Sequence, residues 1–259
     1  MKSKLIILGC GSSMGIPRAD GLWGKCKKNN KKNYRTRCSI IIIKGSNSIL
    51  IDTSPDLRYQ LLSNNIKNIS SVLFTHEHAD QTNGLFDLRP FYMKYKKKID
   101  VYGHLKTINL LKKRHDFCFK DIRGYGAIVK GHIIKKNFSL GSSSERIYFK
   151  TLQVNHGLTK NTAYIFENTA YINDCNDLSI IKMNELKNLK YLIIDCLRIK
   201  KHPSHFNLKE SLYIHNCLKP KKTILTNLHH DLDYDFLLRG LPNNVFPAYD
   251  GLKLFLWKK

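Results

Sequence analysis

The chain has 259 residues, of which 42% are hydrophobic, so it can bury a sizeable core, and we predict one domain over residues 1–259. Its longest apolar runs fall far short of the roughly 18 residues that a membrane helix needs. The first apolar run, 5–8, is too short for a signal peptide. We therefore expect a cytoplasmic protein that makes no membrane contact. The net charge of +24 would attract RNA or small phosphorylated substrates, although the abundance of lysine, asparagine and isoleucine is equally typical of a biased proteome composition.

Short β-branched runs bounded by Gly, Asn or Asp recur along the chain and predict strands, while apolar spacings of three and four between them predict helices. The predicted strands are 5–8, 39–44, 49–52, 71–75, 99–102, 147–155, 162–167, 170–173, 191–195, 223–227 and 252–257. The predicted helices are 55–63, 85–93, 106–113, 177–186, 208–217 and 234–239. Two sheets packed face to face with helices outside them satisfy this order. The predicted fold class is therefore α/β, with a four-layer αββα sandwich.

Two features of the chain limit the kind of site it can hold. The segment 18–37 is rich in Gly, Lys and Asn and too polar for a core element, so we predict a long loop near the mouth of a site. The seven cysteines are odd in number and never spaced as C-x-x-C, which argues against a disulfide framework and a zinc ribbon. We expect reduced thiols, several of them buried.

The strongest chemical signal is the segment 75–81, THEHADQ, directly after an apolar predicted strand. Two imidazoles two residues apart, His76 and His78, and the carboxylate of Asp80 can converge where the chain leaves a strand. Such nitrogen and oxygen ligands suit zinc, manganese or iron. The alternative, that these are polar loop residues, is weaker because the cluster follows a buried strand.

Further candidate ligands follow other predicted strands: His156, Asp174, and the pair His229 and His230. Each alone is more often a turn residue than a ligand. Together they repeat one arrangement, an imidazole or carboxylate at a strand terminus, and a sandwich can gather such termini along one edge. The sequence therefore predicts a metal site built from distant parts of the chain.

At this point the sequence resembles a known family. The segments that carry the resemblance are 8–17 (LGCGSSMGIP), 35–39 (RTRCS), 50–53 (LIDT), the histidine cluster with 84–89, 225–234, and 248–251 (AYDG). They resemble the metallo-β-lactamase superfamily, and within it the cyclic phosphodiesterases that include the phosphoribosyl 1,2-cyclic phosphate phosphodiesterase of phosphonate degradation. The likeness spans nearly the whole chain and implies a hydrolase with two divalent metal ions, zinc or manganese.

The resemblance also implies roles for the candidate ligands. The implied set for the first metal is His76, His78 and His156; Asp80 and either His229 or His230 would hold the second, and Asp174 would bridge the two. We prefer His229, but the sequence leaves this pair open. As a ligand of the second metal, Asp80 is also expected to be a catalytic residue.

Two further residues bear on the metals without being assigned as ligands. Gln81 stands where many superfamily members have a histidine ligand, and because an amide is a poorer ligand, the second site is expected to be weaker, differently coordinated or filled only with substrate. Asp52 resembles a carboxylate that orients a ligating histidine from behind.

His205 is the expected general acid, since it resembles a histidine that faces the substrate phosphate in this branch. The bland alternative is a histidine at the start of a helix with no chemical role. The turn 9–13 (GCGSS) lacks the full glycine fingerprint of a nucleotide-binding loop, and we interpret it as a tight turn close to the metals.

The predicted activity is hydrolysis of a small cyclic or simple phosphodiester. Three alternatives remain open at this stage: a tRNA 3′-processing endonuclease, which the basic charge would suit; a thioester or lactam hydrolase; and a nucleic-acid-binding protein with a degenerate metal site. The sequence shows no Gly/Pro-rich arm of the kind that grips tRNA, so nucleic acid is not the favoured partner. A homodimer is also left open.

Overall fold

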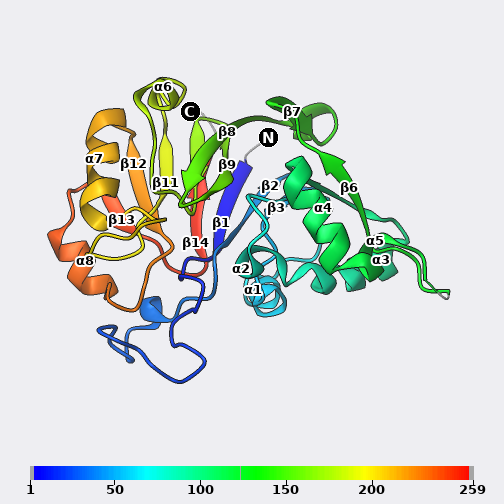
Figure 1. Ribbon diagram of the computed structural model, residues 1–259, viewed down its shortest axis with the longest axis horizontal. Coiled ribbons are helices and arrows are strands. Elements are labelled where there is room, and N and C mark those ends of the chain that lie inside the picture. The colour runs from blue at the N-terminus through cyan, green and yellow to red at the C-terminus, as the bar shows by residue number, and fades with distance from the viewer. Residues whose placement is uncertain (1–2, 123, 257–259) are drawn as a thin grey trace.

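The computed structural model describes residues 3–122 and 124–256, which form two seven-stranded sheets packed face to face. The first sheet has the order β14-β1-β2-β3-β4-β5-β6 and the second β13-β12-β11-β10-β9-β8-β7. Helices α1, α3 and α4 flank one sheet, and α7 and α8 flank the other (Figure 1). The predicted four-layer αββα arrangement is confirmed.

The bounds of the elements show which segments build each layer. The first sheet consists of β1 (Ser3–Gly9), β2 (Ser39–Lys44), β3 (Asn47–Ile51), β4 (Ser71–Leu73), β5 (Ile99–Gly103), β6 (Val129–Ile133) and β14 (Leu252–Phe255). The second consists of β7 (Asn137–Leu140), β8 (Ile147–His156), β9 (Thr159–Phe166), β10 (Thr169–Ile172), β11 (Tyr191–Asp195), β12 (Lys222–Thr226) and β13 (Val245–Pro247). The α-helices are α1 (Leu57–Ser63), α2 (Ala79–Thr82), α3 (Arg89–Tyr95), α4 (Leu105–Arg114), α5 (Asp116–Phe119), α6 (Ile180–Asn184), α7 (Leu208–Leu218) and α8 (Tyr234–Gly240). Short 3-10 turns are η1 (Lys31–Asn33), η2 (Leu85–Leu88) and η3 (Ser143–Glu145).

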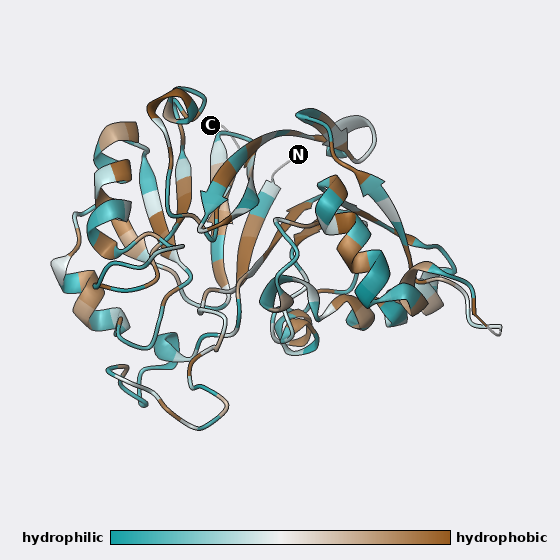
Figure 2. Cartoon of the chain, viewed as in Figure 1, coloured by the Kyte–Doolittle hydropathy of each residue, from teal (hydrophilic) through white to brown (hydrophobic). Residues whose placement is uncertain are grey.

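The layers follow from strands that are apolar on both faces. In β1, Leu5 and Ile7 pack into the core between the sheets, while Ile6 and Leu8 pack against the helices. Because successive side chains of a strand point to opposite faces, one apolar run supplies two cores. Brown stretches of hydrophobic residues accordingly recur along the strands of both sheets in Figure 2.

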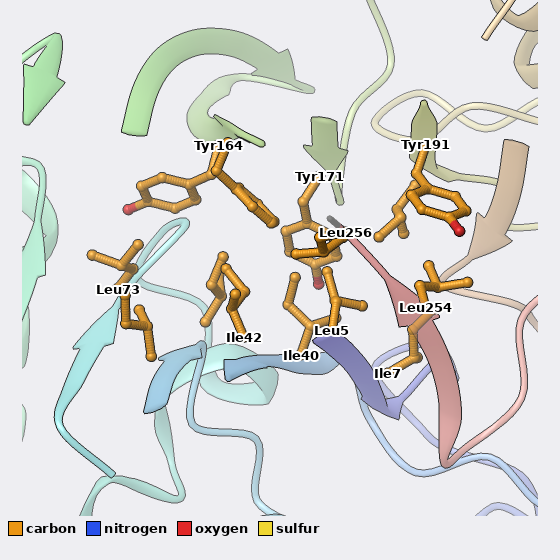
Figure 3. Close-up of a cluster of buried hydrophobic side chains, with 14 of the residues drawn as sticks. Leu5, Ile7, Ile40, Ile42, Leu73, Tyr164, Tyr171, Tyr191, Leu254 and Leu256 are labelled. Carbon is orange, nitrogen blue, oxygen red and sulfur yellow. The ribbon is translucent and has the colours of Figure 1, made fainter. Parts of the chain in front are cut away.

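Tyrosine rings from the second sheet close the core between the sheets. Figure 3 shows Tyr164 and Tyr171 facing Leu5, Ile40 and other aliphatic side chains of the first sheet. Both tyrosines are fully buried, and the Tyr164 hydroxyl donates to the Phe74 carbonyl at 2.7 Å. This bond ties the second sheet to the chain just before the histidine motif.

Parallel strands place several chain ends along one edge of the sandwich. The strands β3 to β6 run parallel, as do β10 to β13, so the carboxyl ends in each set meet at one edge, where α/β proteins bind ligands. Directly after β3, near the end of β10 and after β12, the chain turns at Asp52, Asp174 and Asn227 with φ values of 65°, 50° and 62°. Asp and Asn adopt this left-handed region more readily than most side chains.

Some predicted elements differ from the structure. The strands β6, β7 and β13 were not predicted, because β6 and β7 lie at or near sheet edges and are largely solvent-exposed, and β13 is only three residues long. The helices α2 and α5 were not predicted either, because each has only four residues. The predicted helix 85–93 divides into η2 and α3, and 177–186 contains only the five residues of α6. Trp257, the predicted end of the last strand, lies outside the described residues.

Three other expectations concern the loop, the thiols and the membrane. Segment 18–37 contains only η1 and packs against the chain around residues 230–235, where the Lys25 N–H donates to the His230 carbonyl at 2.9 Å. All seven cysteines are free thiols, and only Cys217 is exposed. Within residues 3–122 and 124–256, no helix combines the length and apolarity needed to cross a bilayer.

Candidate metal centre

Three imidazoles converge at the edge of the sandwich. His76 and His78 follow β4 and His156 ends β8, yet their candidate ligand nitrogens all lie within 4.8 Å of one another. The ring centres are 4.4 Å apart for His76 and His78 and 5.2 Å and 5.1 Å apart for their pairs with His156. Burial lowers the pKa of His76 well below its usual value and that of His156 to about 4. His76 and His156 are therefore neutral at pH 7, the form in which an imidazole binds a metal.

Hydrogen bonds fix which nitrogen of two rings stays free. His156 donates from Nδ1 to the Ser204 carbonyl at 2.7 Å, which leaves Nε2 as the available lone pair. Thr75 donates its hydroxyl to Asp52 at 2.8 Å, and the same oxygen lies 3.0 Å from His76 Nδ1. Asp52 also accepts the Thr75 N–H at 2.8 Å. Asp52 thus acts on His76 through Thr75 and does not touch the ring itself, which refines its predicted role.

The carboxylates Asp80 and Asp174 are joined by the Gln81 side chain. Gln81 donates from Nε2 to Asp80 Oδ2 at 3.1 Å and to Asp174 Oδ2 at 3.0 Å. Asp174 also accepts from the amides of Asn173 and Asn227 at 2.8 Å and 3.0 Å. Burial raises the pKa of both carboxyl groups. Gln81 therefore lies between the carboxylates at the place where the second metal was expected.

His205 is held as a charged group beside these carboxylates. Its Nδ1 donates to Asp195 Oδ2 at 2.8 Å and lies 3.5 Å from Asp174 Oδ1. Burial opposes the charge, but Asp195 and then Asp174 overcome it and raise the pKa of His205 to about 9. His205 is thus protonated at pH 7, with Nδ1 engaged and Nε2 free of protein partners.

The rings of His229 and His230 are neighbours, with centres 3.7 Å apart, but they differ in their access to the cavity. His229 lines the same cavity as His78, and its buried Nδ1 makes no hydrogen bond, although Asp231 Oδ2 lies 3.3 Å away. Burial, and next the neighbouring His230, lower the pKa of His229. The His230 ring packs against Gly24, where a Cβ atom would come within 2.1 Å of it. His230 does not contribute to the cavity lining that the structure describes.

A cavity of about 370 Å³ connects these groups. The candidate ligands and acid–base groups in its lining are His78, Asp80, His156, Asp174, His205 and His229, and the rest is Ser12, Ser13, Met14, Leu197, Arg198, His202, Ser204 and Asn227. Larger cavities of about 770 Å³ and 630 Å³ lie elsewhere on the surface, without a convergent set of imidazoles. The chemistry therefore belongs to the smaller cavity. The turn 9–13 reaches it through Ser12 and Ser13, as expected for a turn close to the metals.

The donor set fits divalent cations. Three imidazoles offer nitrogen ligands, and the carboxyl groups of Asp174, which is buried, and Asp80, which is half-buried, can supply the negative charge that a cation would compensate. Two buried polar atoms beside them, Gln81 Oε1 and His229 Nδ1, have no hydrogen-bond partner. Unpaired polar atoms are costly in a protein interior, so these two atoms are further evidence that the residues present fit a bound cation.

The comparison with protein-family models identifies the family. The model for the beta-lactamase superfamily domain matches residues 47–229, well over half of the chain. The chain belongs to the metallo-β-lactamase superfamily. A crystal structure described as a new diphosphatase from the PhnP family is 32% identical, with a TM-score of 0.90 over 98% of this chain and 97% of that one. This likeness confirms the branch that the sequence motifs indicated.

Two other relatives extend the comparison. Zinc-bound PqqB from Methylobacterium extorquens is 16% identical with a TM-score of 0.76, over 97% of this chain and 99% of that one, and it supports the fold alone. A curated relative named octanoyltransferase, from Porphyromonas gingivalis (strain ATCC BAA-308 / W83), is 28% identical over 99% of this chain. The match spans 52% of that relative, so the chain covers about half its length.

Several residues at the site were not singled out from the sequence, and the side chains of three of them hold the candidate ligands or His205 in place. Asp195 ends β11 and holds His205, Asn227 follows β12 and donates to both Asp174 and Asp195, and Thr75 links Asp52 to His76. Asp195 and Asn227 carry the same signal that indicated Asp174, a polar residue at the end of a predicted strand. Thr75 carries no signal of its own, because a threonine at a strand end is ordinary.

Proposed function

We propose that this protein is a metal-dependent phosphodiesterase that hydrolyses a small cyclic or simple phosphodiester with two divalent ions, zinc or manganese. The observation that carries the proposal is the convergence of three imidazoles beside a cavity that two carboxylates and a protonated histidine also line. The superfamily and the PhnP-family likeness support a metal-dependent hydrolase.

The residues divide between two metal positions. His76, His78 and His156 would hold the first ion, Asp80 and His229 the second, and Asp174 would lie between them. Bound divalent ions would supply the Lewis acidity that activates water and neutralises phosphoryl oxygens. Gln81 fills part of the second position and would have to release both carboxylates, so the second ion is expected to bind more weakly.

His205 supplies the proton that the leaving oxygen needs. Asp195 engages Nδ1 and keeps the ring charged, so the free Nε2–H is the donor available to a substrate in the cavity. Asn227 steadies this pair, because its amide donates to Asp195 at 3.1 Å as well as to Asp174 at 3.0 Å. The ring is thereby held for transfer of its proton to an alkoxide leaving group.

The cavity supports a small substrate. Its volume of about 370 Å³ is at the low end for ligand pockets, and Arg198 at its wall, within a chain of net charge +24, favours an anion. The diphosphatase description of the PhnP-family structure also concerns a phosphorus ester or anhydride. The name octanoyltransferase describes a protein about twice this length and is no argument for acyl transfer by this chain.

Elemental analysis of the purified protein, coupled to hydrolysis of bis-p-nitrophenyl phosphate and of ribose and nucleoside cyclic phosphates, tests the proposal. We expect bound zinc or manganese, turnover that stops on chelation, and recovery when the metal is returned. Metal-replete protein that binds nucleic acid in a salt-dependent way but hydrolyses none of these diesters would contradict it.

A further inference from the structure

Glu77 lies between two metal-ligating histidines but faces away from the cavity. In an extended segment successive side chains alternate, so His76 and His78 can point one way only if Glu77 points the other. The Glu77 side chain is only 8% exposed. A buried carboxylate is expensive unless it is paired, and the structure shows how this one is paired.

Helix α4 binds Glu77 at three points. Lys106 Nζ forms an ion pair with Oε1 at 2.5 Å, and the Thr107 hydroxyl donates to Oε2 at 3.3 Å. At the other end of the helix, Arg114 donates from Nη1 to the Glu77 main-chain carbonyl at 2.6 Å. Both the side chain and the backbone of the residue between the two ligands are therefore attached to one helix.

The helix is itself firmly placed and suited to a carboxylate. Ile108 and Leu111 are buried in the core between the first sheet and its helices, and α4 lies on the outer face of that sheet (Figure 1). The first turn of α4 contains no acidic residue, and its N-cap, His104, makes no side-chain capping bond. Glu77 supplies negative charge from outside the helix where the helix dipole favours it.

The rest of the motif is anchored independently of α4. Asp52 holds Thr75, one residue before His76, and the Thr82 hydroxyl donates to the His78 carbonyl at 2.8 Å. Among the contacts described, those of Glu77 are the ones that link the segment between these anchors to α4. The position of Glu77 therefore sets the directions from which the two imidazoles approach an ion.

We propose that Glu77 is a positioning residue, which raises the metal affinity of the site by fixing His76 and His78 to α4 through Lys106, Thr107 and Arg114. The proposal rests on the proposed metal site. It assigns Glu77 no contact with metal or substrate, and its effect is exerted through ligand geometry. Outer contacts of this kind are commonly worth about 10- to 100-fold in metal affinity.

The test compares zinc affinity and the visible spectrum of bound cobalt for metal-free wild type, Glu77→Gln and Glu167→Gln. Glu167 is the control, because it is a half-buried glutamate (22% exposed side chain) that forms an ion pair with Lys44 at 3.0 Å and does not line the site cavity. We expect about tenfold weaker zinc binding and an altered cobalt spectrum for Glu77→Gln, with wild-type values for Glu167→Gln. A merely structural role would lower the melting temperature without changing the spectrum.

Wild-type affinity and spectrum in Glu77→Gln would overturn the proposal, as would an equal loss in Glu167→Gln. If Glu77→Gln fails to fold, Lys106→Met decides by the same criterion, because the Lys106 side chain is 65% exposed and its replacement leaves the core intact. Wild type that binds no zinc or cobalt would sink the proposed function itself. An unaffected Glu77 variant beside a metal-binding wild type would sink only the role of Glu77.

Discussion

The imidazole side and the carboxylate side of the cavity differ in the hydrogen bonds that their candidate metal ligands make to the rest of the protein. On the imidazole side, His76 and His156 use Nδ1 for protein contacts and keep Nε2 free. On the carboxylate side, Asp80 and Asp174 already accept hydrogen bonds from Gln81, and Asp174 from Asn227 as well. A cation entering the first side displaces no protein bond, whereas one entering the second has to compete with amides.

This difference explains how one site can bind two ions with unequal affinity. Carboxylates left unpaired in a protein interior would be costly, so amide donors stabilise them when no metal is bound. The same amides weaken the second ion. We therefore expect the two ions to bind in separate steps, the first at the imidazole side.

The largest expected effect comes from removing Asp174, the carboxylate that would lie between the two ions. Asp174→Ala should lower hydrolysis by more than about a hundredfold, because even an outer contact to a metal ligand is worth about 10- to 100-fold. Asp177→Ala is the control, since Asp177 is a nearby carboxylate that binds Asn155 at 2.8 Å and does not line the cavity. Steady-state turnover with bis-p-nitrophenyl phosphate measures both. Full activity in the Asp174 variant would refute a centre that uses both sides.

Removing the proton donor should be somewhat milder. His205→Ala is expected to lower turnover by about a hundredfold, the usual scale for general acid catalysis. Metal stoichiometry should stay as in wild type, because His205 already donates to Asp195 and is not assigned to either ion. The two quantities are measured on the same preparation. Loss of metal together with activity would show that His205 belongs to the metal ligands.

The pH profile tests the cause of the His205 charge. The protonated ring is the active form, so turnover should persist below a pH of about 9 and fall as the pH rises through that value. In Asp195→Asn the opposite charge is lost, and the fall should move to lower pH by about one to three units. Measured kcat against pH checks both positions. An unmoved alkaline limb would mean that another group carries the proton.

The smallest effect is expected at Gln81. In Gln81→His an imidazole replaces an amide that donates to both carboxylates, so the second ion should bind about tenfold more tightly while the first is unchanged. Zinc titration of metal-free protein resolves the two steps. Unchanged affinity for the second ion would show that Gln81 does not compete with it.

The features that could be predicted from the sequence are those that depend on local residue patterns. Apolar runs such as 39–44 and 191–195 predicted the bounds of β2 and β11. His156 and Asp174 were indicated by their positions directly after predicted strands. Contacts between distant segments were not predictable in this way. The pairing of Asp195 with His205 and the placing of Gln81 between two carboxylates depend on how the sheets bring chain ends together, and the largely exposed strand β6 lacks the apolar alternation that indicates a strand.

Elemental analysis of wild type and His156→Ala, each dialysed against metal-free buffer, tests the central claim most directly. The account predicts at least one zinc or manganese ion per chain in wild type and its loss in the variant, because His156 closes the imidazole group with His76 and His78. Equal metal content in the two proteins, or none in wild type, would contradict it.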